Sequence, residues 1–193
     1  MSRRHPLESG CSCGSRRRFL RGLLAALPAT VALARHARAD DPAVARRRLQ
    51  LINTHTGEVL DASYFADGAY VPEAMGQFDW LLRDYRTSEV VPIDSRLFDL
   101  LHELALAAGR EPSYEVISGY RSPATNAMLA ATTDGVSSKS LHMQGRAIDV
   151  RLAGFPTAAL RDLALVRQAG GVGYYAVSDF VHLDTGDARG WSG

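Results

Sequence analysis

The sequence predicts a single α+β domain, in which a mostly antiparallel sheet is flanked by helices. Apolar residues repeat every three or four positions in the first half of residues 49–193, which is typical of helices. Short stretches of alternating apolar and polar residues dominate the second half, which is typical of antiparallel strands. The segment has no internal repeat, and its length is enough for one hydrophobic core.

Residues 1–39 are predicted to be a signal peptide that precedes the domain. A twin-arginine export signature lies at 15–21, an apolar stretch at 22–34 and a signal-peptidase site at 37–39. The apolar stretch is shorter than the roughly 20 residues that span a bilayer, so no membrane span is expected in the mature chain. Residues 40–48 are expected to be a flexible tether. We therefore expect a periplasmic protein exported by the twin-arginine pathway; the alternative is a basic amphipathic anchor that stays attached.

The charge argues against nucleic-acid binding, and the cysteine content argues against a cysteine-ligated metal site. The chain has 22 Lys and Arg and 21 Asp and Glu residues, and residues 1–39 hold eight of the basic residues and one acid. The remaining 14 basic and 20 acidic residues give a net charge of −6, which argues against nucleic acid as a partner. Both cysteines, Cys11 and Cys13, also lie in the leader. A metal would thus need His, Asp or Glu ligands, and four histidines are available: His55, His102, His142 and His182.

A hairpin followed by a helix is predicted at the start of the domain. Short apolar stretches at 49–53 and 58–63 flank Thr56-Gly57, a dipeptide typical of a hairpin turn. Pro72 is favourable in the first turn of a helix. The residues after it carry apolar side chains at helical spacing toward Tyr85.

The middle of the domain is predicted to be helix, strand and helix. Asp94 is a good N-cap for a helix whose leucines repeat every three or four residues until Gly109 ends it. A strand is expected at 114–118. Ser122 followed by Pro123 predicts the start of a short helix, because serine caps helices and proline suits their first position.

The last part is predicted to be strand-rich. The polar stretch 132–140 is expected to be a loop, and 146–152 a strand. Thr157 is expected to cap a helix of about three turns. Two further strands, at 172–175 and 180–183, are expected to pair with each other.

Two of these strands place a polar side chain opposite an aliphatic row. Asp149 alternates with Ile148 and Val150, so it points away from their face. His182 is placed in the same way within 180–183. Aspartate is disfavoured in the middle of a strand, and a buried charge needs a partner. Something cationic is therefore expected opposite Asp149.

These residues have a structural explanation as well as a chemical one. Asp149 could pair with an arginine such as Arg121 or face solvent, and a lone strand histidine is more often hydrogen-bonded than a ligand. Two histidines, His142 and His182, together with one aspartate also match a catalytic zinc site that keeps a position for water. Gly145 would let the chain after His142 fold back, because an extended chain would carry Asp149 about 20 Å away.

Three motifs in order resemble a known superfamily. They are Ser-Gly-Tyr-Arg-Ser at 118–122, Ser-x-His-x-x-Gly-x-Ala-x-Asp at 140–149, and Gly-Gly-Val-Gly-Tyr-Tyr with Phe-Val-His-Leu-Asp-Thr-Gly within 170–186. They resemble the D-alanyl-D-alanine metallopeptidase superfamily, shared with lysostaphin and the hedgehog signalling domain. Within it they most resemble the periplasmic murein endopeptidase K-like branch. The likeness extends to 51–58, 78–86 and 97–101, and so covers nearly all of 49–193.

The resemblance implies a zinc metallopeptidase that binds one Zn²⁺ ion per chain. His142, Asp149 and His182 correspond to the family's three ligands, and a water completes the shell. Arg121 matches an arginine that faces substrate in relatives. Its guanidinium could stabilise charge on a peptide carbonyl or bind a substrate carboxylate; the alternative is an ion pair that supports the site.

The resemblance also suggests where to look for a general base. Many relatives have a glutamate three residues before the last ligand, and Asp179 occupies that position here with a shorter side chain. The family's other arrangement, His-x-His, is absent because Phe180 precedes His182 by two residues. Asp184, on the same strand face as His182, is the reserve candidate or a partner of a ligand.

The resemblance implies hydrolysis of peptide crosslinks in peptidoglycan during cell-wall remodelling as the expected activity. The diaminopimelate–diaminopimelate crosslink is the first candidate, followed by the D-alanine–diaminopimelate crosslink. Stem peptides of peptidoglycan are the expected partner. Two alternatives stay open: a D,D- or L,D-carboxypeptidase that trims stem peptides, and a non-catalytic zinc-containing module that binds the wall.

Overall fold

A computed structural model describes residues 46–133 and 136–193 of the chain. The predicted signal peptide at 1–39 and most of the predicted tether at 40–48 lie outside the described residues. The first strand begins at Arg47, two residues before its expected start. Among the described residues, no helix is long and apolar enough to cross a membrane.

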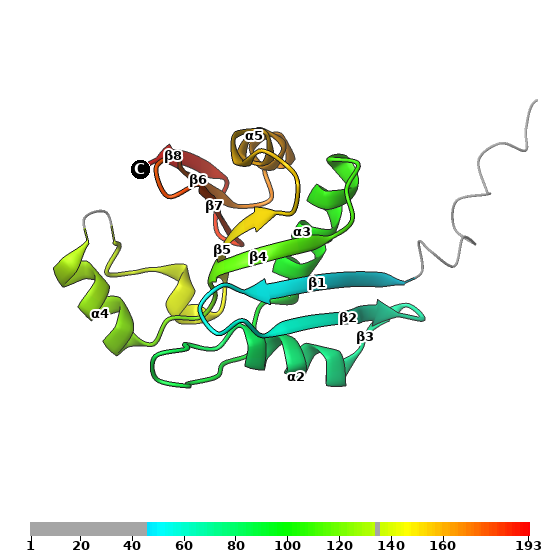
Figure 1. The fold of residues 1–193 in the computed structure, drawn as a ribbon, viewed down its shortest axis with the longest axis horizontal. Coiled ribbons are helices and arrows are strands. Elements are labelled where there is room, and N and C mark those ends of the chain that lie inside the picture. The colour runs from blue at the N-terminus through cyan, green and yellow to red at the C-terminus, as the bar shows by residue number, and fades with distance from the viewer. Residues whose placement is uncertain (1–45, 134–135) are drawn as a thin grey trace, which may run out of the picture. The chain divides into compact units, whose positions relative to one another are not determined.

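In residues 46–133 and 136–193, eight strands form one mixed sheet in the order β3-β2-β1-β4-β5-β7-β6-β8 (Figure 1). The expectation of a mostly antiparallel sheet is corrected, because β1 pairs with β4 and β6 pairs with β8 in parallel. The short strands β3 and β8 at the two edges were not expected. The strands are β1 (Arg47–Asn53), β2 (Val59–Ala66), β3 (Ala69–Tyr70), β4 (Ser113–Ser118), β5 (Ala147–Leu152), β6 (Gly171–Tyr175), β7 (Phe180–Asp184) and β8 (Arg189–Ser192).

Four α-helices and one 3₁₀ turn accompany the sheet in the described part of the chain, which confirms the α+β class. Asp94 and Ser122 cap their helices as predicted, each accepting a backbone hydrogen bond. Thr157 does not cap its helix: Pro156 holds that position, and Thr157 is the first helical residue. The elements are α2 (Pro72–Leu81), α3 (Ser95–Ala107), α4 (Pro123–Thr132), η1 (Leu141–Gln144) and α5 (Thr157–Arg167).

Helix α2 ends at Leu81, earlier than the expected extension toward Tyr85. The reason lies in the next turn, where the Asp84 carboxylate accepts hydrogen bonds from the backbone N–H groups of Arg86 (3.0 Å) and Ser122 (2.8 Å). A carboxylate that bonds to these two N–H groups fixes a turn instead of a further helical turn. The bond to Ser122 also ties this turn to the start of α4.

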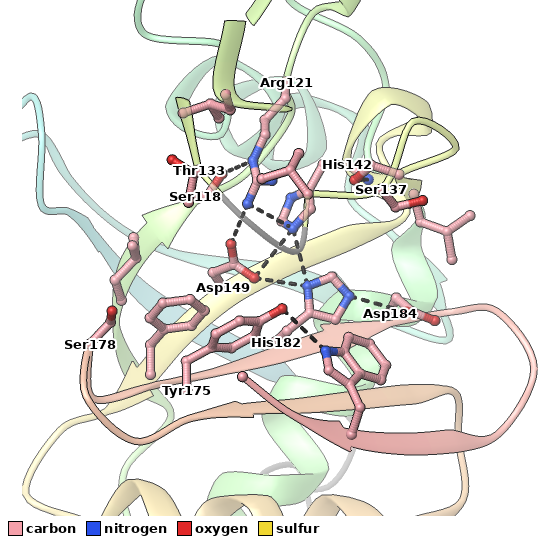
Figure 2. A pocket seen from close by; sticks show the side chains of 18 of the residues that line it. Ser118, Arg121, Thr133, Ser137, His142, Asp149, Tyr175, Ser178, His182 and Asp184 are labelled. Atoms are coloured by element: carbon pink, nitrogen blue, oxygen red, sulfur yellow. Dashed lines mark hydrogen bonds and ion pairs between the residues drawn. The ribbon is translucent and has the colours of Figure 1, made fainter. Parts of the chain in front are cut away.

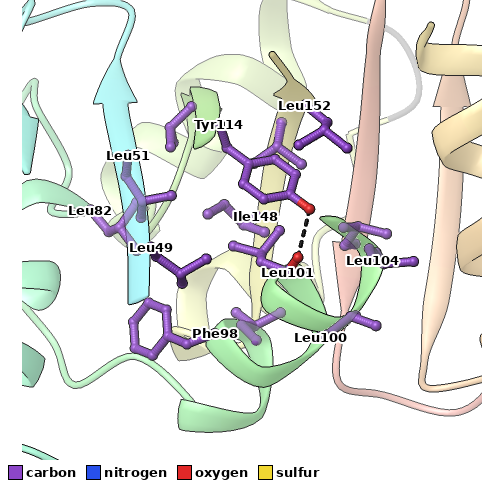
Figure 3. Packing of buried hydrophobic residues seen from close by; sticks show 14 of the residues in the cluster. Leu49, Leu51, Leu82, Phe98, Leu100, Leu101, Leu104, Tyr114, Ile148 and Leu152 are labelled. Carbon is purple, nitrogen blue, oxygen red and sulfur yellow. Dashed lines mark hydrogen bonds between the residues drawn. The ribbon is translucent and has the colours of Figure 1, made fainter. Parts of the chain in front are cut away.

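One face of the sheet carries the hydrophobic core. Helices α2, α3 and α5 supply apolar side chains to this core, which is shared with the inward-facing residues of six strands. Tyr114 is fully buried there, and its hydroxyl donates a hydrogen bond to Leu101 O (2.6 Å) (Figure 3). Leu49, Leu51, Phe98, Leu104, Ile148, Val150, Leu152, Val181 and Leu183 belong to the same cluster. The opposite face is left for polar side chains.

A β-bulge changes which face the end of β4 presents. Val116 pairs with Val150, but Ser118, two residues later, pairs with Asp149, only one residue away. Ile117 is therefore the extra residue. Because side chains alternate between faces, the extra residue turns Ser118 to the same face as Asp149.

Candidate metal centre

Asp149 and His182 lie opposite each other on neighbouring strands. They are direct partners in the antiparallel ladder of β5 and β7, and paired residues project on the same face of a sheet. Both are buried, with exposed fractions of 3% and 9%. Their placement away from the aliphatic face agrees with the alternation in the sequence.

His142 reaches the same point from the 3₁₀ turn η1. Ser140 Oγ accepts a hydrogen bond from the His142 backbone N–H and starts the turn. Gly145 ends the turn with φ of 64°, a left-handed conformation that favours glycine. A Cβ at this position would lie 2.5 Å from Pro92 O. Gly145 thus lets the chain fold back, so that His142 meets Asp149.

One atom from each of the three residues points to a common centre (Figure 2). His142 Nε2 lies 3.1 Å from His182 Nδ1 and 3.2 Å from Asp149 Oδ1, and the distance from His182 Nδ1 to Asp149 Oδ1 is 2.8 Å. Ligands of a tetrahedral ion with bonds of about 2.0–2.1 Å lie about 3.3 Å apart. The observed triangle is slightly smaller, so these residues fit a small divalent cation.

A backbone carbonyl determines which nitrogen of His142 carries the hydrogen. His142 Nδ1 lies 2.7 Å from Gly119 O, and a carbonyl can only accept, so Nδ1 carries the hydrogen. The lone pair is then on Nε2, which faces the centre. Burial lowers the pKa of His142 and favours this neutral form.

The Asp184 carboxylate holds the His182 ring on the side away from the centre. Its Nε2 lies 3.1 Å from Asp184 Oδ2, which directs Nδ1 toward the centre. Asp184 is fully buried and also accepts hydrogen bonds from Arg189 and from the backbone N–H groups of Gly171 and Gly186. Burial raises the pKa of Asp184, but the hydrogen bonds from His182 and Arg189 outweigh it and hold this pKa well below its ordinary value.

Asp149 on β5 and His182 on β7 both favour their charged forms, which have opposite signs. Burial lowers the pKa of His182, but hydrogen bonds to Asp149 and Asp184 outweigh it and raise this pKa to about 8. Burial raises the pKa of Asp149, but the charge and hydrogen bonds of His142 and His182 hold this pKa well below its ordinary value. A cation that binds His182 must therefore displace a proton.

Arg121 pairs with the oxygen of Asp149 that does not face the centre. Its Nη2 donates to Asp149 Oδ2 (2.5 Å) and lies 3.2 Å from His142 Nε2, and its Nε donates to Ser118 Oγ (2.8 Å). Both sequence-based interpretations of Asp149 thus describe part of the geometry: Oδ2 meets an arginine while Oδ1 faces two imidazoles. Nη1 of Arg121 makes no hydrogen bond to any described residue.

The structure does not bring Asp179 to this cluster. Asp179 lies in the turn before β7 with φ of 51°, and its side chain is 65% exposed. Its Oδ1 accepts a hydrogen bond from Thr157 Oγ1 (2.5 Å), and its Oδ2 lies 3.8 Å from Arg151 Nε. These contacts place the carboxylate in a different cleft, which Thr157 and Arg151 line.

A cleft of about 690 Å³ opens over the three converging residues. Of the two remaining histidines, His55 lines this cleft and stacks on Tyr85 at 4.1 Å between ring centroids. His102 lies elsewhere, with its Nδ1 3.3 Å from Arg48 O. In the described part of the chain, the charged lining comprises Arg86, Arg121, Lys139, Arg189, Asp149 and Asp184.

Sequence reasoning missed two residues beside the centre, Arg189 and Trp191. Trp191 lies against His182, with ring centroids 5.1 Å apart. Both residues come from the edge strand β8, which is only four residues long and includes a glycine. A segment this short gives no periodic signal, so only the pairing with β6 reveals their position.

The fold and the site define a class: an α+β domain with a buried His–Asp–His group at the base of a cleft, the donor set of a metal-dependent hydrolase. A family model described as peptidoglycan L,D-endopeptidase MepK matches residues 41–191, and the chain belongs to this peptidase family. Peptidoglycan L,D-endopeptidase MepK of Escherichia coli (strain K12) is 43% identical over 145 residues, which are 75% of this chain and 80% of the relative. The probable peptidoglycan L,D-endopeptidase MepK of Haemophilus influenzae is 40% identical over 148 residues, 76% and 80% of the two chains. The resemblance seen in the motifs is thereby confirmed.

Proposed function

We propose that this chain is a zinc-dependent murein endopeptidase that hydrolyses peptide crosslinks of peptidoglycan in the periplasm after twin-arginine export. The observation that carries the proposal is the convergence of His142, Asp149 and His182 on one buried point beneath a cleft. The relatives named as peptidoglycan L,D-endopeptidases supply the substrate class. We propose the diaminopimelate–diaminopimelate crosslink as the first substrate and the D-alanine–diaminopimelate crosslink as the second.

In this proposal His142, Asp149 and His182 hold the ion, and Arg121 acts on the substrate. A bound zinc ion would polarise a peptide carbonyl and activate water near neutral pH. Gly119 and Asp184 keep both imidazoles in the tautomer that points a lone pair at the centre. Arg121 keeps Nη1 for a substrate oxygen while its other nitrogens are anchored on Ser118 and Asp149.

The charge of the cleft supports an acidic peptide as substrate. The mature chain is predicted to be acidic overall, yet four cationic and two anionic residues line the described part of the cleft. Both anions, Asp149 and Asp184, are buried and paired with arginines. Arg86 is exposed and stacks on Tyr85 at 4.3 Å, so its charge is available to substrate carboxylates.

One observation favours a second candidate function, a zinc-containing module that binds the wall without cutting it. Hydrolysis by this chemistry usually needs a general base near the metal. Asp149 and Asp184 are the carboxylates among the described residues that line the cleft, and both are engaged. Asp179 does not enter the proposal as base, because its carboxylate is bonded to Thr157.

The test is digestion of purified crosslinked muropeptide dimers by the mature protein, followed by mass spectrometry of the products. We expect monomers to appear with Zn²⁺ and to disappear with a chelator or in His142→Ala. Asp179→Asn is the matched control, because it alters a carboxylate outside the cluster and should leave the products unchanged.

Each other outcome overturns the proposal in a recognisable way. Dimers that stay intact while the protein binds Zn²⁺ and sediments with peptidoglycan would establish the wall-binding module. Trimming of monomeric stem peptides with dimers left intact would establish a carboxypeptidase. Unchanged digestion by His142→Ala would show that the proposed metal site is not needed for activity.

A further inference from the structure

We propose that Arg189 and Trp191 of the edge strand β8 are positioning residues that hold His182 in its ligand orientation from across an intervening strand. The inference rests on the proposed metal-dependent function. It concerns residues that touch neither the centre nor the reacting atoms, and that act through Asp184 and the His182 ring.

The sheet register places these residues beside His182 although their strands are not neighbours. Strand β6 lies between β7 and β8. Gly173 of β6 pairs with His182 on one side and with Trp191 on the other, and Gly171 pairs with Arg189. Paired residues share a face, so Arg189, Trp191 and His182 all project on the polar face.

Gly171 and Gly173 of β6 leave the space in which side chains of β8 reach those of β7. A Cβ on Gly171 would lie 2.4 Å from Asp184 Oδ2 and 2.6 Å from Arg189 Nη1. A Cβ on Gly173 would lie 2.6 Å from the Trp191 ring. Glycine is disfavoured inside strands and often marks a close approach of another group. At Gly171 the approaching groups are Asp184 of β7 and Arg189 of β8, and at Gly173 the group is Trp191 of β8.

Arg189 completes a chain of contacts that ends on a proposed ligand. Its Nη2 donates to Asp184 Oδ2 (2.6 Å) and its Nη1 to Asp184 Oδ1 (3.2 Å). This two-point contact fixes the carboxylate plane. Asp184 Oδ2 in turn lies 3.1 Å from His182 Nε2 (Figure 2), so a fixed carboxylate fixes the ring.

Trp191 packs beside the His182 ring and restricts its orientation. The two rings are tilted by 51° with centroids 5.1 Å apart. The indole is itself held, because Trp191 Nε1 donates to Tyr175 Oη (3.1 Å) and the Arg189 guanidinium lies 5.1 Å from its ring centroid. His182 is thus confined by a hydrogen bond on Nε2 and by an aromatic ring beside it.

The experiment measures Zn²⁺ affinity by competition with a chromophoric chelator, together with the absorption spectrum of the Co²⁺ form and the melting temperature without metal. Arg189→Ala and Gly173→Ala should each weaken Zn²⁺ binding by about 10–100-fold, the usual effect of losing an outer partner of a ligand. Arg189→Lys should restore part of the affinity, because it keeps the charge but not the two-point contact. The Co²⁺ spectrum should shift in the weakened variants.

Arg161→Ala is the matched control. Arg161 also stacks on an aromatic ring, Tyr174 at 4.6 Å, and pairs with a carboxylate, Asp162 at 2.8 Å. It lies on α5, which packs on the apolar face, so its loss should leave Zn²⁺ affinity and the Co²⁺ spectrum unchanged.

Two results would overturn the inference without touching the proposed function. One is Zn²⁺ affinity within about threefold of wild type in both Arg189→Ala and Gly173→Ala. The other is a lower melting temperature with an unchanged Co²⁺ spectrum, which would mean that β8 stabilises the fold only. Failure of the wild-type protein to bind Zn²⁺ would instead overturn the proposed function.

Discussion

Strands β5 and β7 present two buried faces that are stabilised in different ways. On one face Ile148 and Leu183 are fully buried against helices, while on the other Asp149 and His182 are nearly as buried. The apolar face is held by packing, which does not depend on charge. The polar face is held by ion pairs and hydrogen bonds, which depend on the ionisation of each group. Burial alone therefore does not distinguish a core residue from a candidate ligand; the partners do.

The largest effect is expected from Asp149→Asn on the polar face. The substitution keeps the shape but replaces a charged oxygen donor with an amide, so Zn²⁺ binding and crosslink cleavage should fall by more than the 10–100-fold typical of outer partners. The loss should appear in both the chelator competition and the muropeptide assay. Cleavage above a tenth of the wild-type rate would show that Asp149 does not hold the metal.

A substitution of Ile148, which is next to Asp149 but on the apolar face, should reduce stability and leave Zn²⁺ binding unchanged. Ile148→Ala leaves a cavity in the core, so the free energy of unfolding should fall by about 2–5 kcal/mol. Urea denaturation of the metal-free protein measures this change. The folded protein should keep its wild-type Zn²⁺ affinity, and a large loss of affinity would mean that the two faces are not independent.

Acid should lower the stability of the fold through the buried carboxylate of Asp84. Burial raises the pKa of Asp84, but hydrogen bonds from Thr125 and Ser122 outweigh it and lower this pKa to about 2. Because the folded pKa lies below the unfolded value of about 3.9, the charged carboxylate stabilises the fold above about pH 4. That contribution is lost as the pH falls through about 2.

Asp84→Asn should therefore reduce the decline in unfolding free energy between about pH 4 and pH 2. Urea titrations of both proteins at several pH values in this range provide the measurement. Parallel curves for variant and wild type would contradict the assignment of this dependence to Asp84.

The smallest effect is expected from Asp179→Asn. Its carboxylate binds Thr157 and lies outside the cleft over the centre, so crosslink cleavage should stay within a few-fold of wild type. Loss of a general base typically costs 10²–10⁴-fold. A loss of that size in steady-state kinetics would restore Asp179 as the base.

The elements that could be predicted from the sequence are those with long or alternating patterns. The leucine repeat after Asp94, the Ser122 cap and the alternation around Asp149 are local features, and each has the expected structure. The parallel pairings of β1 with β4 and of β6 with β8 depend on contacts between distant segments, so no local pattern contains them.

The candidate site was predictable to the same extent. His142, Asp149 and His182 were identifiable by motif, and the structure brings them together. Asp179 was assigned by its distance from His182 along the chain. It lies in the turn before β7, where alternation no longer determines direction, and Thr157 fixes its side chain. Arg189 and Trp191 were missed because they act across an intervening strand.

The irregular pairing at Ile117, rather than the length of β4, decides which way the end of the strand faces. If Ile117 paired regularly with Asp149, Ser118 would turn inward and Arg121 would move away from Asp149. A chain without Ile117 would place Ser118 directly after Val116, and alternation would still turn it to the face of Asp149. The site thus depends on Ile117 staying outside the regular ladder.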